Sequence, residues 1–420
     1  MAISLKPLFD HPGNGQFYKK VFLIMAEPER VISFRVNWMD DKGNICHNRG
    51  WRIEFSSVLG PYKGGLRFHP TVDEGVLKSL GWEQIFKNAL TGMPLGAGKG
   101  GSDFDPKGKS DAEIRRFCES FMIELYRYLH PSTDVPAGDI GVGGREIGYL
   151  YGQYKRLTNR HGGGVLTGKS ILFGGSHLRP EATGFGLVYI AKIAIEKNGH
   201  TLSGKRCMVS GSGNVAQYAS KKLLEMGAKV ITMSDSNGCI FFENGLSEDD
   251  WKLIVEAKQV HRARLSSLPI GKYMPDKSPW NLSFTTFDYA FPCATQNEID
   301  RDGAASLVKN GVQGLFEGAN LPTTLEGQDI LRKKQILYIP GKAANAGGVA
   351  VSGLEMSQNA QRLQWSEEEI DNRLHSIMTD IYDQIEAQSR NGSGGTLEDG
   401  ATCAGFLKVA QAMKEMGWVY

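Results

Sequence analysis

The sequence predicts an α/β protein of two domains, and three observations support this prediction. A chain of 420 residues is too long for one ordinary hydrophobic core. The first part mixes strand-like alternation with helical spacing, whereas the later part repeats strand, helix and strand in the order that builds a parallel sheet. We expect a mixed α/β domain over residues 1–174 and a Rossmann-like domain over residues 175–396, with 397–420 returning to the first domain as a helix.

The first domain begins with helix-like sequence and continues into a predicted hairpin. In Val31–Trp38 every second residue from Ile32 is apolar, which is typical of a half-buried strand. Trp51–Phe55 resumes this alternation after the turn-forming Asp41–Asn44. Helical apolar spacing and then glycine-rich stretches follow, at 73–90, 110–129, 137–144 and 161–168.

The second domain contains a βαβ unit. Arg206–Ser210 is a short apolar strand, Asn214–Met226 has helical spacing, and Lys229–Ser234 is a second apolar strand. Polar residues follow two later apolar strands, and ligands of open parallel sheets bind at such carboxyl ends. These strands, a glycine-rich linker and a last helix are predicted at Tyr289–Thr295, Val312–Phe316, 391–395 and roughly 399–416.

The βαβ unit carries a dinucleotide-binding pattern. Its first strand runs into Gly211-Ser212-Gly213-Asn214-Val215-Ala216, which matches GxGxxA between a strand and a helix. Gly211 allows the tight turn, Gly213 lets the backbone approach a pyrophosphate at the helix N-terminus, and Ala216 packs the helix against the strand. Asp235 closes the next strand about 20 residues further on. This context favours a nucleotide site over a glycine-rich turn that binds nothing.

The choice between NAD and NADP depends on the residues near Asp235. A carboxylate here would accept a hydrogen bond from a ribose 2′-hydroxyl and favour NAD. Basic residues near the same ribose favour the 2′-phosphate of NADP, although a basic helix face is more often simply solvated. Ser236 and the basic residues that follow are the candidates, with Lys258, His261, Arg262 and Arg264. We expect NADP and keep NAD as the alternative.

Composition excludes several classes of function. Forty-eight basic and forty-six acidic side chains give a net charge of +2, so no sign-biased surface for nucleic acid or an anionic membrane is expected. No segment has the apolar length of a signal peptide or a bilayer span. The six cysteines lack a CxxC pair and the nine histidines lack metal-ligand spacing. We therefore expect reduced thiols, a cytoplasmic location and no metal.

Lys99 stands among four glycines in LGAGKGGSD. This stretch resembles part of a phosphate-binding loop, but the Walker pattern fails, because Met93 occupies its first glycine position and Gly100 follows the lysine. We expect these glycines to let the backbone close over the amine and exclude water.

Two more lysines and one aspartate lie in comparable settings. Lys63 lies in GPYKGGLRF, Lys87 follows Gln84 in a helical stretch, and Asp139 lies in PAGDIG. Any one of these lysines taken alone is more often a surface charge, and Asp139 alone could be a turn former. Their combination with glycine-rich flanks and a nucleotide fold predicts a site.

Four long motifs cover residues from about 60 to 360: GPYKGGLRFHP, KNALTGMPLGAGKGGSDFDPKGKS, DVPAGDIGVGGREIGY and AANAGGVAVSGLEMSQN. They resemble the glutamate dehydrogenase family and, more narrowly, its small hexameric class of bacteria and fungi. The resemblance implies reversible NADP-dependent oxidative deamination of L-glutamate to 2-oxoglutarate and ammonium in a homohexamer.

The resemblance also implies a role for each matching position. Lys99 would be the general acid/base, and Asp139 the carboxylate that handles protons at the amino nitrogen. Lys87 would hold the α-carboxylate and Lys63 the side-chain carboxylate. The other residues implied around the substrate are Gly64, Gln84, Ala137, Thr167, Val349 and Ser352. Those implied around the cofactor are Lys107, Arg179, Thr183, Gly211, Ser212, Gly213, Asn214, Val215, Asp235, Ser236, Lys258, Arg264, Ala294, Thr295, Asn320 and Asn345.

This chemistry gives the charged residues a physical purpose. Glutamate carries a carboxylate at each end, so two separate cations are needed to hold it. A base must take protons near neutral pH, whereas a free lysine has a pKa of about 10.4. Burial and neighbouring cations lower the pKa of a lysine, and Lys99 would experience both.

Two alternatives remain open at this point. The nearer one is a leucine, valine or phenylalanine dehydrogenase of the same superfamily. An apolar substrate side chain would leave Lys63 and Ser352 nothing to bind, and an unpaired buried ammonium is costly. The other is a catalytically silent nucleotide-binding protein on the same fold, which the presence of Lys99 and Asp139 disfavours.

Overall fold

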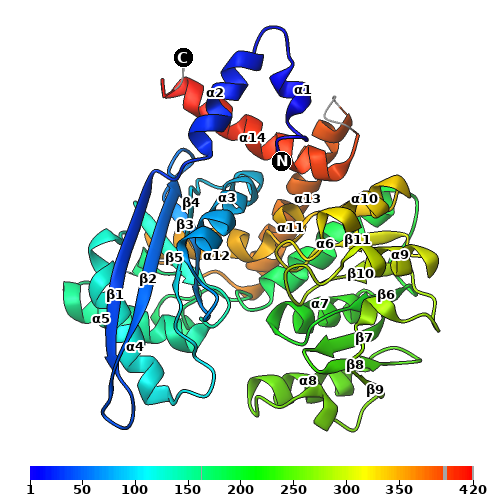
Figure 1. The fold of residues 1–420 in the computed structure, drawn as a ribbon, viewed down its shortest axis with the longest axis horizontal. Coiled ribbons are helices and arrows are strands. Elements are labelled where there is room, and N and C mark those ends of the chain that lie inside the picture. Colours follow the sequence, from blue (N-terminus) through cyan, green and yellow to red (C-terminus); the bar gives the residue numbers. More distant parts are fainter. Residues whose placement is uncertain (162, 391–394, 419–420) are drawn as a thin grey trace. The chain divides into compact units, whose positions relative to one another are not determined.

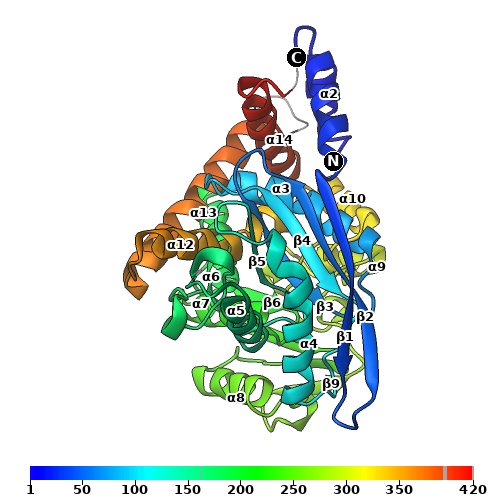
Figure 2. The same ribbon diagram turned by 90° about the vertical axis from the view of Figure 1, so that its left-hand side faces the viewer.

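The computed structural model describes residues 1–161, 163–390 and 395–418, which form two compact units (Figures 1 and 2). The N-terminal unit comprises Ala2–Arg179, Val349–Asn372 and the chain from Ala404 onward. The central unit comprises Pro180–Gly348 and Arg373–Cys403, and each unit has its own sheet. The two-domain α/β architecture is confirmed. Most of the linker predicted at 391–395 lies outside the described residues.

The N-terminal unit contains a mixed five-stranded sheet. Its strands are β1 (Arg30–Met39), β2 (Ile45–Ser56), β3 (Tyr62–Phe68), β4 (Ala97–Ser102) and β5 (Asp134–Gly138), in the order β1-β2-β4-β3-β5. β1 and β2 form the predicted antiparallel hairpin, and Asp40 accepts the backbone N–H of Asn44 in its turn. β2 pairs antiparallel with β4, whereas β3 pairs parallel with both β4 and β5.

Helices cover both faces of this sheet. The helices of the unit before residue 180 are α1 (Lys6–Phe9), α2 (Gly15–Met25), α3 (Glu74–Leu90), α4 (Asp111–Leu125) and α5 (Gly144–Thr158). α4 and α5 pack side by side and bury an aromatic core against the sheet (Figure 2), in which Phe104 and Phe117 stack at 3.8 Å. Lys99 of β4 faces α3 instead, because Gly81 of that helix lies against it. The sheet thus separates an apolar face from a charged one.

The C-terminal part of the chain returns to the N-terminal unit, as predicted. Two helices contribute to this return, α12 (Gly347–Gln361) and α14 (Leu397–Glu415). α14 lies beside α2 (Figures 1 and 2), and Phe406 contacts the rings of Phe9 and Tyr18. Lys408 on the same helix donates to the carbonyl of Ala89 at the end of α3.

The glycine-rich stretches around Lys63 and Lys99 are strands of the sheet, which the sequence analysis did not predict. Glycine is disfavoured in strands unless another group approaches the backbone closely. Arg52 of β2 is one such group, because a Cβ on Gly98 would lie 3.0 Å from its Nη2 and a Cβ on Gly100 would lie 3.0 Å from its Cδ. The side chain of Leu66 and the carbonyl of Trp51 would be closer still to the Cβ on Gly100, at 2.8 Å. These two glycines therefore make room for Arg52, and the expectation that the glycines close over Lys99 stays a prediction.

Arg52 crosses the sheet to reach a carboxylate. Its Nε lies 2.8 Å and its Nη2 2.5 Å from the two oxygens of Asp134 on β5, and its Nη1 donates to the carbonyl of Gly64. Both side chains of this pair are fully buried. A bidentate pair with a further hydrogen bond to a carbonyl is an arrangement in which a buried charge is tolerated. Glycines of β3 and β4 thus accommodate this ion pair, since Gly64 accepts a hydrogen bond from Arg52 and Gly98 and Gly100 leave space for its side chain.

The central unit contains a seven-stranded sheet in the order β12-β11-β10-β6-β7-β8-β9. Five strands are parallel, and β8 and β9 extend the sheet as an antiparallel edge. The strands are β6 (Arg206–Val209), β7 (Lys229–Asp235), β8 (Gly238–Phe241), β9 (Lys272–Pro275), β10 (Tyr289–Phe291), β11 (Gly314–Phe316) and β12 (Leu337–Ile339). The predicted strand at Tyr289–Thr295 ends at Phe291 because Pro292 has no N–H for the ladder.

Helices surround this second sheet. They are α6 (Ala182–Lys197), α7 (Asn214–Glu225), α8 (Glu248–Gln259), α9 (Arg301–Lys309), α10 (Leu325–Lys333), α11 (Gly341–Ala344) and α13 (Glu367–Arg390), the last of which begins in the N-terminal unit. α7 connects β6 to the neighbouring β7, whereas β10 lies on the other side of β6. Strand order therefore reverses at β6, and such a switch point is where open α/β sheets bind ligands.

Two further properties concern the described residues as a set. None of their helices combines the length and the apolar composition that a bilayer crossing requires. The six cysteines, all among these residues, are free thiols, and five of them are buried.

Candidate functional site

Lys99 is the buried member of an ion-pair cluster whose other members, Arg67 and Asp139, are half-buried. Its Nζ lies 3.2 Å from one carboxylate oxygen of Asp139, and Nε of Arg67 lies 2.6 Å from the other. Lys99 is 3% exposed, although ammonium groups are rarely removed from water to this degree. Asp139 lies just after β5, where a Cβ on Gly65 of the adjacent β3 would be 2.7 Å from its own Cβ. The glycine of β3 therefore lets the aspartate approach the sheet.

The charges of this cluster shift one another's pKa values. Burial lowers the pKa of Lys99, and Arg67 lowers it further, while Asp139 acts in the opposite direction. Burial alone would raise the pKa of Asp139, but Lys99 and Arg67 outweigh it and the net pKa lies below its ordinary value. The pair can therefore present an ionised carboxylate beside an amine that loses its proton more readily than a free lysine.

Lys87 and Gln84 lie next to this cluster on α3. Burial and the nearby Lys99 lower the pKa of Lys87 to about 8. Gln84 is buried, and its Nε2 donates to Oδ1 of Asn88 at 2.7 Å. Asn88 in turn donates to the carbonyls of Lys63 on β3 and Gly96 before β4, at 3.0 and 2.5 Å. One carboxamide thus connects the three elements that carry the predicted lysines.

Lys63 occupies a second buried position. Its side chain is fully buried, and Nζ donates to the carbonyl of Val135 at 2.8 Å and to Oγ1 of Thr167 at 2.7 Å. Burial lowers its pKa well below the ordinary value, and the cations Arg179 and Arg52 contribute to this shift. Gly64 and Ala137 lie nearby on the paired strands β3 and β5.

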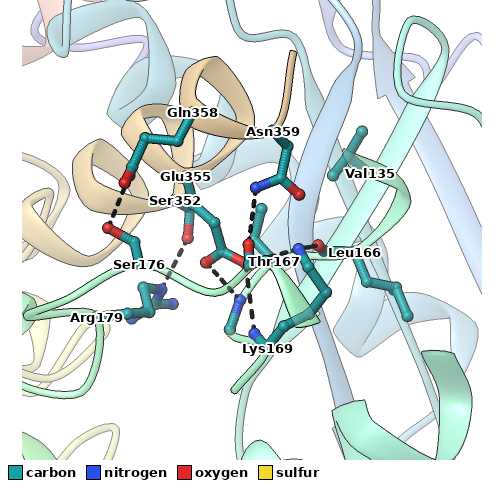
Figure 3. A network of polar contacts seen from close by, with 12 residues as sticks. Val135, Leu166, Thr167, Lys169, Ser176, Arg179, Ser352, Glu355, Gln358 and Asn359 are labelled. Carbon is teal, nitrogen blue, oxygen red and sulfur yellow. Dashed lines mark hydrogen bonds and ion pairs between the residues drawn. The ribbon is translucent and has the colours of Figure 1, made fainter. Parts of the chain in front are cut away.

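Ser352 and Arg179 complete this second position (Figure 3). Nε of Arg179 donates to Oγ of Ser352 on α12 at 2.9 Å. We call Lys63, Thr167, Arg179 and Ser352 the distal pocket. Arg179, which the resemblance placed near the cofactor, thus lies against Ser352, whereas Val349 is half-buried one turn earlier on α12.

The central unit has the local geometry of a dinucleotide turn. Gly211 has φ of 84°, a conformation that favours glycine, and its N–H donates to Oγ of Ser234 at the end of β7. Gly213 is the N-cap of α7, and Ala216 is buried as predicted. The first amides of α7 therefore point out of the turn, as an anion site at a helix N-terminus requires. The side chain of Asn214 instead donates to the carbonyl of Pro180 at 2.5 Å.

The carboxylate of Asp235 accepts hydrogen bonds from two backbone N–H groups. Its Oδ1 accepts the N–H of Asn237 and its Oδ2 accepts that of Leu265, both at 2.9 Å. The second bond holds the neighbouring Arg264, whose Nη1 donates to Oγ of the exposed Ser236 at 2.6 Å. Lys258 donates to the carbonyl of Ala263 in the same loop. The carboxylate thus positions a guanidinium at the place where a ribose 2′-substituent is expected.

Other predicted cofactor residues gather at the carboxyl ends of β10 and β11. Nδ2 of Asn345 donates to Oδ1 of Asn320 at 3.1 Å. Ala294 and Thr295 are exposed after β10, and their N–H groups donate to Oε1 of Glu298. Thr183 is half-buried in the first turn of α6. Lys107 is exposed before α4 in the N-terminal unit, and its predicted contact with the cofactor stays a prediction.

Glu317 is a buried carboxyl at the end of β11. It accepts the hydroxyl of Tyr338 at 2.7 Å and the N–H of Gly341, the first residue of α11, at 2.8 Å. Burial raises its pKa to about 7. Because α11 ends beside Asn345, this carboxyl supports the Asn320–Asn345 contact.

The raised pKa of Glu317 predicts a pH dependence of stability. The folded protein favours the neutral carboxyl, so this stabilisation is complete below pH 4.5 and is lost as the pH rises through about 7. We expect the free energy of unfolding of the unchanged protein to fall by about 3 kcal/mol relative to Glu317→Gln between pH 4.5 and 8. Urea titrations of both proteins across this range measure the difference, and a difference that stays constant with pH would contradict it.

Sequence reasoning missed three residues of these sites. Arg67 lies in the quoted motif GPYKGGLRF, and strand alternation places it on the same face as Lys63 and Gly65. That signal was available. Lys169 and Glu355 form a buried ion pair at 2.7 Å, although 186 residues separate them, and nothing local in the sequence indicates it. Among the residues described, no group of His, Cys, Asp and Glu could hold a metal ion.

Comparison with known proteins gives consistent matches. The model of the family described as Glutamate/Leucine/Phenylalanine/Valine dehydrogenase matches residues 174–417, and that of the Glu/Leu/Phe/Val dehydrogenase dimerisation domain matches residues 28–156. The NADP-specific glutamate dehydrogenases of Chlorella sorokiniana and Escherichia coli K12 are 53% and 52% identical, with 100% and 95% of this chain aligned to 80% and 90% of theirs.

Solved structures agree with this result. Plasmodium falciparum glutamate dehydrogenase 2 is 54% identical with a TM-score of 0.90, and covers 99% of this chain and 91% of its own. A structure titled glutamate dehydrogenase is 46% identical with a TM-score of 0.94, at 99% and 93% coverage. Both the sequence and the fold therefore lead to one assignment. This chain belongs to the Glu/Leu/Phe/Val dehydrogenase family.

Proposed function

We propose that this chain is an NADP-dependent glutamate dehydrogenase, which catalyses the reversible oxidative deamination of L-glutamate to 2-oxoglutarate and ammonium. The observation that carries the proposal is the charge arrangement of the N-terminal unit. The buried amine of Lys99 pairs with the half-buried carboxylate of Asp139, and the half-buried cation Lys87 lies beside this pair. A second cation, the buried Lys63, lies among the hydroxyl groups of the distal pocket. Two separately held cations fit a substrate with a carboxylate at each end.

Each group then has a stated task. Lys87 and Gln84 bind the α-carboxylate of the substrate, and Lys63 with Ser352 binds its side-chain carboxylate. A charge-assisted contact of this kind is about twice as strong as a neutral hydrogen bond. Gly64, Ala137, Thr167 and Val349 line the same region. Holding both ends fixes Cα and its amino group relative to Lys99 and Asp139, which is the positional part of catalysis.

The proton chemistry belongs to Lys99 and Asp139. Bound NADP supplies the acceptor for the hydride that leaves Cα as the amine becomes an imine. Asp139, kept ionised by Lys99 and Arg67, takes a proton from the amino nitrogen. Lys99, whose pKa burial lowers, takes a proton from the water that adds to the imine carbon and later returns one to the departing nitrogen.

The coenzyme choice is supported by Arg264. Asp235 accepts one backbone N–H on each carboxylate oxygen, so it holds the loop that carries Arg264. Arg264 and Ser236 then offer a guanidinium and a hydroxyl to a 2′-phosphate. A relative from Xylanibacter ruminicola, 50% identical over 95% of this chain and 90% of its own, is named NAD(P)-specific. Use of NAD beside NADP is therefore measured by comparing turnover with NADH and with NADPH.

The direct test is the loss of absorbance of the reduced nicotinamide. We expect turnover with 2-oxoglutarate, ammonium and NADPH, and little with 4-methyl-2-oxopentanoate. Activity on the branched substrate alone would favour the other dehydrogenases of the family. Binding of NADPH without turnover of any 2-oxo acid would favour the catalytically silent protein.

Removing the guanidinium of Arg264 tests the coenzyme site. We expect Arg264→Gln to raise the KM for NADPH about tenfold or more and to leave that for NADH nearly unchanged, because a charged hydrogen bond contributes about 1.5–3 kcal/mol. Arg301→Gln is a matched control, since Arg301 is an exposed arginine of the same unit at the start of α9. Equal effects on both coenzymes would contradict the assignment.

The remaining parts of the proposal concern organisation. We propose a substrate domain over residues 1–174 and 397–420, a dinucleotide domain over 175–396, a cytoplasmic location and a homohexamer. The family description of residues 28–156 as a dimerisation domain supports self-association, and the free cysteines fit a reducing compartment. The mass of the purified protein in solution tests the hexamer, since each chain has a mass of 46.1 kDa.

A further inference from the structure

The buried ion pair of Lys169 and Glu355 lies beside the distal pocket (Figure 3). Both side chains are fully buried, and Nζ of Lys169 lies 2.7 Å from Oε1 of Glu355. Lys169 also donates to the carbonyl of Leu166. Neither residue has a part in the chemistry proposed above. A buried ion pair often adds little to the stability of the folded protein, because removing both charges from water is costly. Stability alone therefore does not explain this pair, which indicates another role.

The pair connects the two segments that form the pocket. The other carboxylate oxygen of Glu355 accepts the N–H of Gly168 at 2.9 Å, and Oε1 also accepts that of Lys169 at 3.4 Å. Thr167, which bonds Lys63, precedes these two amides directly. Ser352 lies three residues before Glu355 on α12, hence about one helical turn away. One carboxylate therefore joins the backbone that carries Thr167 to the helix that carries Ser352.

The same carboxylate influences the charges of the pocket. Burial lowers the pKa of Arg179, and Glu355 opposes this shift. Burial, Arg179 and Arg52 lower the pKa of Lys63, which Glu355 and Asp134 oppose. Glu355 thus opposes the lowering of the pKa of both groups, while its own oxygens accept hydrogen bonds from other donors. It can support them without competing for the place of an incoming carboxylate.

We propose that Glu355, held by Lys169, is the positioning residue of the distal pocket and so sets the preference for dicarboxylic over monocarboxylic 2-oxo acids. This inference rests on the proposed function. Without the carboxylate, the 167–169 segment and α12 lose their common acceptor, and Thr167 and Ser352 lose their fixed separation. A diacid depends on that separation, because its second carboxylate enters the pocket. A monocarboxylic 2-oxo acid of the same length has nothing there to align.

The experiment compares two substrates in each variant. We measure kcat/KM for 2-oxoglutarate and for 2-oxopentanoate with NADPH and ammonium, in the unchanged protein and in Glu355→Gln and Lys169→Met. We expect the ratio of the two values to fall about tenfold or more in both variants, mainly through the KM for 2-oxoglutarate, with 2-oxopentanoate changed by less than about threefold.

A matched control separates positioning from general loss of structure. Glu146 on α5 of the same unit is 5% exposed and also accepts one backbone N–H, that of Gly143, and an arginine, Arg145. We expect Glu146→Gln to affect both substrates alike, so that their ratio stays within about twofold. If Glu355→Gln does not fold, the double variant Lys169→Met/Glu355→Gln carries the test, because it buries no unpaired charge.

The outcomes are distinguishable. An unchanged ratio in a folded Glu355→Gln or double variant, or an equal fall of the ratio in Glu146→Gln, overturns the inference while leaving the proposed function intact. A parent protein that does not reduce 2-oxoglutarate overturns the proposed function itself. A fall of the ratio confined to the Lys169 and Glu355 variants supports the positioning role.

Discussion

Lys99→Ala is expected to lower kcat for 2-oxoglutarate reduction by about a thousandfold or more, since general acid–base groups contribute about 10²–10⁴-fold. The physical reason is the position of its amine, which is buried and 3.2 Å from Asp139. Alanine removes the group that exchanges protons with water and substrate, and leaves Asp139 paired with Arg67 alone. The rate of NADPH oxidation at saturating substrates measures the effect.

The control for this variant must show that binding survives. NADPH titration should give a dissociation constant close to that of the unchanged protein, because the dinucleotide turn belongs to the central unit. Lys78→Ala is a matched lysine variant, since Lys78 lies on α3, is partly exposed and pairs with Glu74. We expect it to keep full activity. Near-normal turnover of Lys99→Ala would remove the central residue of the proposed mechanism.

Lys63→Leu is expected to lower kcat/KM for 2-oxoglutarate by about a hundredfold or more, because truncating one member of a buried charge contact costs about 3–5 kcal/mol. The lysine is fully buried and bonds only neutral oxygens in the described structure, at Val135 and Thr167. Its amine can therefore bind the side-chain carboxylate of the substrate. Leucine at this position would instead favour a substrate with an apolar side chain. We expect 4-methyl-2-oxopentanoate to gain relative to 2-oxoglutarate.

Stability and a matched lysine check this second variant. Leucine removes the desolvation cost of the ammonium but also its hydrogen bonds to Val135 and Thr167. These changes oppose each other, so the melting temperature should change little. Lys408→Leu is the control, because Lys408 is a half-buried lysine of the same unit that donates to one backbone carbonyl, that of Ala89. It should leave substrate preference unchanged. An unaltered KM and kcat for 2-oxoglutarate in Lys63→Leu would show that the side-chain carboxylate binds elsewhere.

Local sequence patterns predicted the parts of the molecule that short stretches of chain determine. The β1–β2 hairpin follows from alternation on both sides of a turn, and its pairing was confirmed. The strand, turn and helix around Gly211 follow from residues that are neighbours in sequence, and the positive φ of Gly211 agrees with the purpose assigned to it. In both cases the interacting groups are close along the chain, so the sequence itself contains the signal.

The glycine-rich strands β3 and β4 are elements that local sequence patterns did not predict. We expect their glycines to let the backbone close over Lys99, and Gly98 and Gly100 also make room for Arg52, which bonds Asp134 from 82 residues away. The local propensity of these glycines does not predict a strand. The glycines fit this strand because the side chain of Arg52, from another strand, lies against its backbone. The motif quoted around Lys63 nevertheless contained Arg67, and strand alternation could have identified it.

By itself the sequence determined the two-domain α/β class and the dinucleotide turn and, through resemblance, predicted the lysines of the proposed substrate site. Only the tertiary structure decided which groups those lysines contact, how Asp235 holds the loop of Arg264, and how Glu355 joins Lys169 and the pocket. The reason is physical. Burial, desolvation and ion pairing depend on side chains that the sheet and α12 bring together from distant parts of the chain, and these terms set the charge state and the geometry of the site.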